Sequence, residues 1–417
     1  MRCMHTPCSV AAVDLQVETF AAVRSLRVAY VTETWPPEVN GVSLTAQRMV
    51  EGLHRRGHAV QLVRPRQVHA DAPESSPRFH EVLMRGLPIP RYPELRMGLP
   101  SRRALLSLWA TRRPDVVHVA TEGPLGWSAV QAAHRLRLPV TSDFRTNFHA
   151  YSRHYGVGWL RKPIMAYLRR FHNATLSTLV PTAPLKQELL EAGFRNVQVV
   201  ARGVDAQRFS PAHRSDALRS SWGVAPDDLV VSCVGRLAPE KNLLLLRRAY
   251  EAIRLELPRA RLLLVGDGPM RTELARCLPD ALMVGQQRGE ALSAHYASAD
   301  LFLFPSLTET FGNVTAEAMA SRLPVLAFDY AAAAQLIQPG ISGELVPFGD
   351  GDEFVRSAVA LARNDTHRRS IAQQARERAQ QQDWDEVITR FEAELVRASL
   401  QARAGPWAAV AAAGAHP

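Results

Sequence analysis

The chain of 417 residues is longer than one hydrophobic core ordinarily supports, which predicts two domains. Hydrophobic residues make up 47% and charged residues 22% of it, which excludes a disordered or fibrous protein, and no apolar run reaches the roughly eighteen residues of a transmembrane helix. The four cysteines, Cys3, Cys8, Cys233 and Cys277, are too scattered for a disulfide framework or a zinc site, which indicates a reducing, cytoplasmic compartment.

Residues 1–24 show no periodic pattern, and we interpret them as a disordered leader. From residue 25 to 205, short apolar runs that predict buried strands alternate with helical patterns. The predicted strands are 26–31, 59–63, 115–119, 139–142, 178–181 and 197–201, and the helical patterns cover 42–56 and about 128–136. This alternation is typical of a parallel sheet with helices on both faces, so 25–205 is predicted to form a Rossmann-like domain.

The pattern lapses at residues 203–228, which we interpret as a linker, and then starts again. Within 206–380 the predicted strands are 229–235, 260–266, 281–284, 301–305 and 324–328, and the predicted helices are 242–255, 271–277, 290–298 and 314–321. A terminal helix in 381–400 is expected to return to the first domain, and 401–417 is expected to be a flexible tail. The predicted fold class is α/β, with two doubly wound Rossmann-like domains that face each other across a ligand cleft.

Two common nucleotide motifs are absent from the sequence. No G-x-G-x-x-G follows the first predicted strand and no Walker A sequence occurs, which disfavours dinucleotide binding and P-loop hydrolysis. Asp350-Gly351-Asp352 has a D-x-D spacing, but nothing near it resembles a metal site, and we interpret it as a surface turn.

The most informative segment runs from residue 304 to 324. A strand ends there, a loop carries Glu309, Gly312 and Asn313, and a helix that starts near Val314 holds Glu317 in its first turn. The N-terminus of a helix offers free backbone N–H groups and a positive dipole end, which together bind phosphate. Taken alone, Glu317 also fits simple dipole complementarity in a first helical turn.

A second segment, Gly235 to Asn242, follows the first strand of the second domain. It places Arg236 and Lys241 on a loop at the carboxyl end of a parallel strand. Arginine offers a bidentate fork and lysine a mobile point charge, a pair that suits a diphosphate. Two cations and one helix N-terminus in the same domain indicate a diphosphate leaving group.

The Glu309–Glu317 spacing, Phe311-Gly312-Asn313, Gly235-Arg236 and Glu240-Lys241-Asn242 together resemble the retaining family-4 glycosyltransferases of the GT-B fold. The resemblance covers residues 26–399 and implies a nucleotide-sugar donor as substrate, no cofactor and no metal. It implies donor contacts for Asn40, Gly41, Arg236, Lys241, Gly285, Gln286, Glu309, Gly312, Asn313, Val314 and Glu317, with Glu317 on the ribose. It implies catalytic roles for Glu309, Arg236, Lys241 and His149, although a structural role for His149 stays open.

The chain departs from the family pattern after the strand at 324–328. Asp329-Tyr330-Ala331-Ala332-Ala333-Ala334-Gln335 stands where many members have a Gly-Gly pair and, shortly after the strand, a glutamate. The phosphate-binding residues are intact, so this departure bears on the preference for the donor sugar or base rather than on the class of reaction.

A block without acidic residues lies between Asp143 and Glu188 and holds seven basic ones. Such a block indicates either an anionic partner or a solvated basic face. An apolar stripe at helical spacing, Leu160, Ile164, Tyr167, Leu168 and Phe171, suits either an interfacial helix on anionic lipid or a core-facing helix. The residues expected at a membrane or acceptor surface are Trp159, Arg161, Lys162, Tyr167, Arg169 and Arg170.

The segments 121–126 and 146–151 look similar to bacterial GDP-mannose-dependent α-mannosyltransferases and to enzymes that glycosylate diacylglycerol. The resemblance therefore implies retaining transfer of a hexose, with mannose from GDP-mannose preferred, to a lipid-linked or glycan acceptor at the inner membrane surface. The alternatives are a UDP-sugar-dependent diacylglycerol glycosyltransferase, a nucleotide-sugar epimerase, a binding protein with a decayed site and a basic nucleic-acid binder. No nucleic-acid motif supports the last of these.

Overall fold

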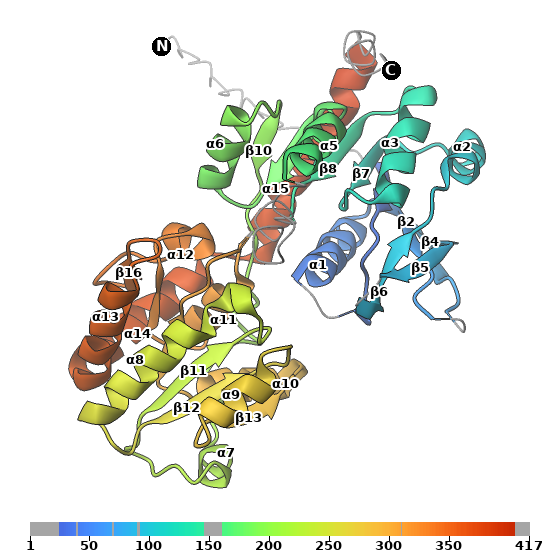
Figure 1. Ribbon diagram of the computed structural model, residues 1–417. Coiled ribbons are helices and arrows are strands. Elements are labelled where there is room, and N and C mark those ends of the chain that lie inside the picture. Colours follow the sequence, from blue (N-terminus) through green and yellow to red (C-terminus); the bar gives the residue numbers. More distant parts are fainter. Residues whose placement is uncertain are drawn as a thin grey trace, which may run out of the picture.

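The computed structural model describes residues 25–38, 41–68, 71–89, 92–145, 161–309 and 311–404. Two α/β domains lie next to each other, each built on a largely parallel sheet with helices on both faces (Figure 1). The predicted fold class is confirmed. The expected leader and nearly all of the expected tail fall outside the described residues, and the boundaries predicted for the domains stay predictions.

The sheet of the first domain has the strand order β10-β9-β8-β7-β1-β2-β4-β3. All neighbouring strands are parallel except β3 and β4. The strands are β1 (Arg27–Val31), β2 (Ala59–Pro65), β3 (Ser75–Ser76), β4 (Phe79–Met84), β7 (Val116–Val119), β8 (Val140–Asp143), β9 (Ser177–Val180) and β10 (Val197–Val199). The chain builds outward from β1 in one direction and then from β7 in the other, so the strand order reverses between β1 and β7, where ligands bind in such sheets.

The helices of this domain cover two faces of the sheet. They are α1 (Gly41–Arg55), α2 (Arg102–Thr111), α3 (Pro124–Arg135), α5 (Arg161–Asn173) and α6 (Ala183–Glu191). Helix α3 begins four residues before the predicted start because Pro124 occupies its first position, where the preset φ of proline favours the helix. Sequence analysis predicted neither α2 nor the hairpin of β5 (Gly86–Ile89) and β6 (Tyr92–Gly98).

The second domain is a six-stranded parallel sheet with the order β13-β12-β11-β14-β15-β16. Its strands are β11 (Val230–Val234), β12 (Arg261–Val265), β13 (Leu282–Gly285), β14 (Leu301–Phe304), β15 (Val325–Phe328) and β16 (Glu344–Val346). Its helices are α7 (Asp216–Ser221), α8 (Leu243–Glu256), α9 (Arg271–Cys277), α10 (Gly289–Ala297), α11 (Asn313–Ala320), α12 (Ala331–Leu336), α13 (Gly351–Arg363) and α14 (Asp365–Gln380).

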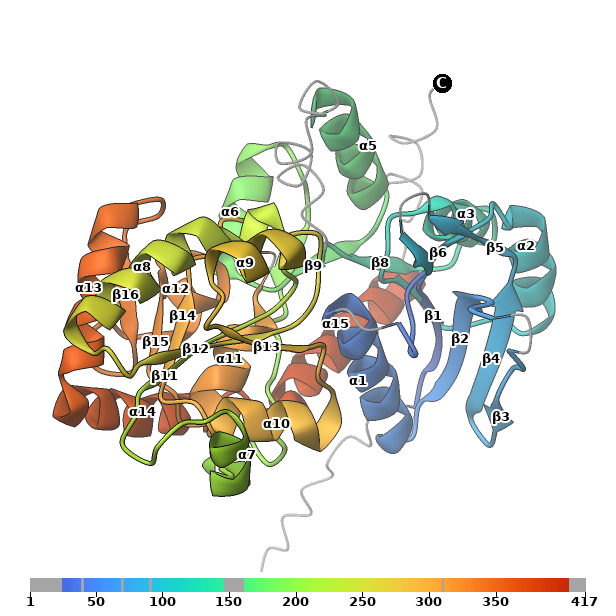
Figure 2. The same ribbon diagram turned by 60° about the horizontal axis from the view of Figure 1, so that its bottom comes forward.

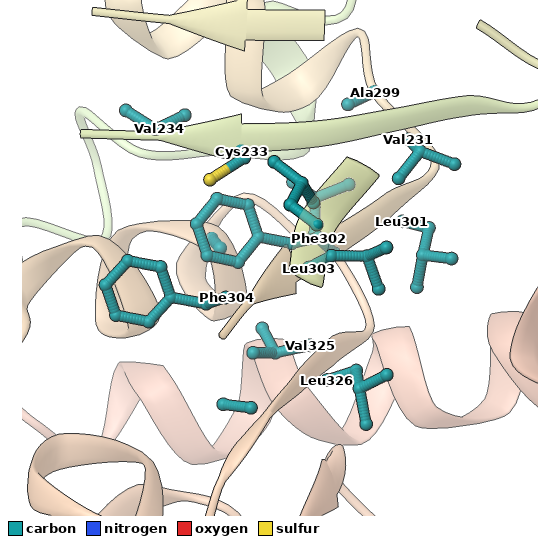
Figure 3. Close-up of a cluster of buried hydrophobic side chains, with 14 of the residues drawn as sticks. Val231, Cys233, Val234, Ala299, Leu301, Phe302, Leu303, Phe304, Val325 and Leu326 are labelled. Atoms are coloured by element: carbon teal, nitrogen blue, oxygen red, sulfur yellow. The ribbon is translucent and has the colours of Figure 1, made fainter. Parts of the chain in front are cut away.

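The centre of this sheet is a closely packed apolar core (Figure 3). Phe302 and Phe304 of β14 stack with their ring centroids 5.8 Å apart, and Cys233 of β11 lies beside them. Burial raises the pKa of the Cys233 thiol to about 12, which makes this cysteine an inert part of the core.

The segment 203–228 is not the free linker that its composition indicated. Val204, Phe209, Trp222 and Val224 are buried in the core of the second domain, and the segment contains α7. Its polar composition reflects short capped turns at the surface, such as Ser215 accepting the N–H of Leu218 at the start of α7.

The last helix, α15 (Trp384–Ala404), leaves the second domain and packs on the first, as predicted (Figures 1 and 2). Ile388, Phe391 and Leu395 are fully buried against β1 and α1. A Cβ atom on Gly52 of α1 would lie 2.3 Å from Ile388, so only glycine lets the two helices approach this closely. The helix extends to Ala404, four residues beyond its predicted end. Within the described residues, no helix has the length and apolarity needed to cross a membrane.

The packing of α15 predicts the effect of truncating Phe391. Its ring meets Tyr30 and His118 in edge-to-face geometry at centroid distances of 6.4 and 4.8 Å. We expect Phe391→Ala to destabilise the first domain by about 3–5 kcal/mol because it leaves a cavity between helix and sheet. The exposed neighbour Arg390→Ala is the control and should change stability by no more than about 0.5 kcal/mol in calorimetric unfolding. Equal effects of the two variants would contradict the docking of α15.

Candidate active site

The start of α11 lies at the carboxyl end of β14. Gly312 precedes the helix with φ of 94°, a left-handed conformation that glycine adopts without strain. As the N-cap residue, Gly312 has no side chain with which to cap the first turn of α11, so it leaves the first N–H groups of the helix open to an external acceptor. The helix predicted to start near Val314 thus starts one residue earlier, at Asn313, and phosphate binding at this loop stays a prediction.

Glu309 and Lys241 form an ion pair directly beside this helix start. Ser306 Oγ donates a hydrogen bond of 2.8 Å to the same Glu309 Oε1, and Tyr330 OH donates one of 2.9 Å to the Glu309 carbonyl. The Lys241 ammonium also lies 5.4 Å from the centre of the Phe304 ring. The structure thus brings together the carboxylate and the cation that sequence analysis selected from two segments 68 residues apart.

The loop after β11 carries both predicted cations of the second domain. Arg236 is exposed, whereas Lys241 ends a short 3₁₀ turn and is mostly buried. Asn242 follows with φ of 53° and starts α8. Because β11 and β14 are adjacent parallel strands, their loops emerge at the same edge of the sheet, and this places the Lys241 loop against the Glu309 loop.

Glu317 lies one turn into α11 and accepts a hydrogen bond of 2.9 Å from Tyr296 OH. Burial raises the pKa of the Glu317 carboxyl above its ordinary value, while the Tyr296 hydroxyl and the charge of Arg208 act against the rise. Burial also raises the pKa of Tyr296 well above its usual range, which keeps its hydroxyl a donor.

Gly285 is the last residue of β13, at the edge of the second sheet, and Gln286 follows it. The carbonyl of Gly285 accepts a hydrogen bond of 2.8 Å from the Gly266 N–H, which holds this turn to the next strand, and Gln286 is exposed. Two strands separate β13 from β14, so this pair is reached only by a ligand that extends along the edge of the sheet.

Gly41 is the first-domain residue that meets this edge. It is the first residue of α1, and a Cβ atom there would lie 3.2 Å from Arg202 Nη1 and 3.5 Å from Asn313 Nδ2. Asn313 is the first residue of α11, so the glycine of the first domain reaches the helix of the second domain that is predicted to bind phosphate. Asn40, His149 and Trp159 lie outside the described residues, as does Arg161 as far as its side chain is concerned.

The first domain contains a buried carboxyl group that sequence analysis did not select. Glu33 follows β1 and accepts backbone hydrogen bonds from Gly98, Leu125 and Gly126 at 3.1, 2.8 and 3.3 Å. Burial raises its pKa to about 7, although these three donors act in the opposite direction. Glu33 thus joins the hairpin β5–β6 to the start of α3.

Other residues missed by sequence analysis are Tyr296, Ser306 and Arg202. Tyr296 and Ser306 orient the two glutamates and carry no motif of their own. Arg202 follows β10 and donates a hydrogen bond of 3.1 Å to Asn313 Oδ1 across the cleft. Its position after a predicted parallel strand was a usable signal, because ligand-binding residues gather at that end of such sheets.

The apolar stripe of α5 packs into the protein. Leu168 and Phe171 are buried in two core clusters, and Ile164 packs against one of them. The core-facing alternative therefore holds for these residues, which are not free to enter a membrane. Tyr167 remains 41% exposed, and Lys162, Arg169 and Arg170 are exposed beside it.

Within the described ranges, no three His, Cys, Asp or Glu side chains group as metal ligands. The candidate site consists of a helix N-terminus, a lysine and two glutamates, and it lies on the second Rossmann-like domain where the first domain contacts it. This fold and this site define a glycosyltransferase of the GT-B class.

Comparison with known proteins identifies the family. Residues 39–208 match the family model described as Glycosyltransferase Family 4, and residues 228–364 match Glycosyl transferases group 1. The chain is 34% identical to the GDP-mannose-dependent alpha-mannosyltransferase of Mycobacterium tuberculosis over 90% of its own length and 99% of that protein. The chain belongs to the family-4 glycosyltransferases.

Two further similarities are more distant. The alpha-monoglucosyldiacylglycerol synthase of Streptococcus pneumoniae is 23% identical, and the match covers 78% of this chain and 76% of that protein. The structure of sucrose-phosphate synthase from Thermosynechococcus elongatus superimposes with a TM-score of 0.73 at 19% identity, over 90% of this chain and 98% of that one, which shows the shared fold.

The hydrogen bond between Tyr296 and Glu317 generates a pH prediction. An ionised Glu317 can accept hydrogen bonds from the ribose hydroxyls of the donor, whereas protonation weakens this acceptor. We therefore expect donor binding to be lost as pH falls through the pKa of this carboxyl. Tyr296→Phe removes the hydroxyl that holds this pKa down, so binding should be lost at a higher pH than in the wild type, with about tenfold weaker affinity near neutrality. Titration calorimetry with a nucleoside diphosphate across pH measures both, and Tyr250→Phe, which loses a hydroxyl bound to Ala260, is the control. Identical pH profiles would refute the pairing.

Proposed function

We propose that this enzyme transfers mannose from GDP-mannose, with retention of configuration and without a metal ion, to a lipid-linked or glycan acceptor. The observation that carries the proposal is the meeting of Lys241, Glu309 and the uncapped start of α11 at one edge of the second domain. A cation and a helix N-terminus suit a departing diphosphate, and the carboxylate beside them faces the sugar that stays behind.

The proposed reaction uses electrostatic stabilisation of the leaving group. Arg236, Lys241 and the N–H groups of Gly312 to Val314 bind the diphosphate, and Glu317 holds the ribose. As the bond between sugar and phosphate breaks, negative charge grows on the phosphate, where these donors are already in position. The acceptor hydroxyl attacks from the face that the phosphate leaves, and the phosphate oxygen takes its proton. Lys241 exchanges its partner Glu309 for the phosphate, which releases Glu309 toward the sugar.

GDP-mannose is supported by the similarity to the mycobacterial mannosyltransferase, which extends over nearly the full length of both chains. The departure at 329–332 does not disturb the backbone of the donor loop. Ala331 takes φ of 54°, a conformation that glycine adopts readily, and Ala332 donates a hydrogen bond of 2.7 Å to the Phe311 carbonyl. Alanine in this left-handed conformation costs about 1 kcal/mol.

A lipid-linked acceptor is supported by two observations. The name of the streptococcal relative states that it makes a glucosylated diacylglycerol. In this chain, Lys162, Tyr167, Arg169 and Arg170 of α5 present an exposed aromatic and basic surface. Because the apolar side of α5 packs inward, contact with a membrane would depend on charge and on Tyr167 rather than on insertion of the helix.

A donor panel tests the proposal. GDP-mannose at a hundred times its Kd should stabilise the protein by about 2.7 kcal/mol in thermal unfolding, more than UDP-glucose or ADP-glucose at equal concentration. Lys241→Ala should lower turnover about 10²–10³-fold, whereas Arg248→Ala, which removes an exposed cation on α8, should not. A preference for UDP-sugars would favour the diacylglycerol glycosyltransferase alternative. No shift with any nucleotide sugar would refute both.

Vesicle sedimentation tests the membrane surface. The double variant Lys162→Glu and Arg170→Glu should weaken binding to vesicles rich in anionic lipid at least about tenfold, because each basic residue near such a surface contributes about 1 kcal/mol. The matched control is Arg276→Glu with Arg369→Glu, two exposed bases on α9 and α14 of the second domain. If the two double variants bind equally well, α5 is not the contact surface.

A further inference from the structure

Two buried arginines lie where the first domain meets the donor-binding edge. Arg145 follows β8 and Arg202 follows β10, and their exposed fractions are only 3% and 4%. Neither belongs to a motif that sequence analysis connected with the donor. Buried guanidinium groups stay charged, and such a charge is costly unless an anion accompanies it.

Arg145 shares its carboxylate with a histidine. Its Nη2 donates to Asp143 Oδ1 at 3.2 Å, and His118 Nε2 lies 3.3 Å from Asp143 Oδ2. Although burial opposes it, the combined charges of Arg145 and His118 hold the pKa of Asp143 well below its usual range. Arg145 Nη1, by contrast, has no hydrogen-bond partner within the part of the chain that the structure describes.

In the described part of the chain, Arg202 is paired with no carboxylate. Among the described residues its only hydrogen bond is the one to Asn313 Oδ1, its Nε is without a partner, and it forms no ion pair. Its guanidinium lies 5.8 Å from the centre of the Phe311 ring, next to Gly312. Burial, together with the charge of Arg145, lowers the pKa of Arg202 to about 9, although Asp143 and Glu309 act in the opposite direction. The two carboxylates whose charges reach Arg202 already have other partners, since Asp143 is paired with Arg145 and Glu309 with Lys241.

The geometry points to a phosphate-type oxyanion as the missing partner: we propose that Arg202 and Arg145 form a first-domain anion site that faces the N-terminus of α11. The proposal rests on the proposed function, because it assigns a ligand to the same cleft. Arg202 already touches Asn313 at the start of α11, so an oxyanion that accepts from the α11 amides comes within reach of Arg202 Nε.

This oxyanion has two sources, the diphosphate of the donor and a phosphate on the acceptor. A donor phosphate would be held from both domains, by Lys241 and α11 on one side and by the two arginines on the other. It would then draw the domains together, which a site in one domain cannot do. A phosphate of the acceptor would instead be placed beside the reacting sugar by the first domain alone.

The test compares Arg202→Gln and Arg202→Lys with the wild type, using GDP, inorganic pyrophosphate and GDP-mannose as probes in titration calorimetry. Arg202→Gln should weaken GDP and pyrophosphate binding by roughly tenfold to a hundredfold, because a bond between charged groups is lost, and Arg202→Lys should fall between. The matched control is Arg195→Gln, an exposed arginine seven residues before Arg202. If the wild-type protein binds no nucleotide at all, the proposed function is wrong, and not only the assignment of this anion site.

Steady-state kinetics separate the two sources. If GDP binding is unchanged in Arg202→Gln but the KM for a phosphorylated acceptor rises about tenfold or more, the site is kept and its ligand is the acceptor phosphate. Circular dichroism and the melting temperature show whether Arg202→Gln folds. If it does not fold, the same comparison can be made by measuring how far pyrophosphate raises the melting temperatures of Arg145→Lys and Arg202→Lys. A folded Arg202→Gln with wild-type binding of GDP, pyrophosphate and acceptor would overturn the proposal.

Discussion

The two domains are joined by a chain that crosses between them twice, and the two crossing segments are bonded to each other. The N–H of Val204 donates a hydrogen bond of 2.9 Å to the carbonyl of Gln382, and Gly203 lies so close to Trp384 that a Cβ atom would come within 2.8 Å of it. Beyond this point α15 packs on the first sheet through Phe391. The connection is thereby fixed in two places, which limits how the carboxyl ends of the two sheets can face each other.

The active site depends on this arrangement because it is assembled from both sheets. Gly41 and Arg202 come from the first domain, and both lie against Asn313 of the second. A single flexible linker would allow these groups to separate, and the proposed phosphate site at the α11 N-terminus would then lack the first-domain cation. The hydrogen bond between Arg202 and Asn313 is thus both a contact between domains and part of the proposed donor-binding edge.

Charge is distributed unequally across the cleft. In the second domain the cation Lys241 has its own carboxylate, Glu309, whereas on the first-domain side Arg202 has none among the described residues. An anionic ligand would therefore have to displace Glu309 from Lys241, whereas at Arg202 it would neutralise a buried charge directly. This asymmetry suits an enzyme whose leaving group carries most of the developing charge.

The sequence by itself determined the elements whose signal is local. Buried parallel strands such as β1 and β14 need short apolar runs, which are visible in the sequence. The two loops were also predictable, because Gly312 in one and Asn242 after Lys241 in the other are residue types that adopt a left-handed backbone. The hairpin β5–β6 and α2 were not predicted, although α2 carries a buried i, i+4 pair, Leu105 and Trp109. Tertiary structure decided which side of α5 is buried, that Tyr296 binds Glu317, and that Arg202 reaches Asn313 across 111 residues of chain. These outcomes depend on which surfaces meet after folding, and no local pattern of residues encodes that meeting.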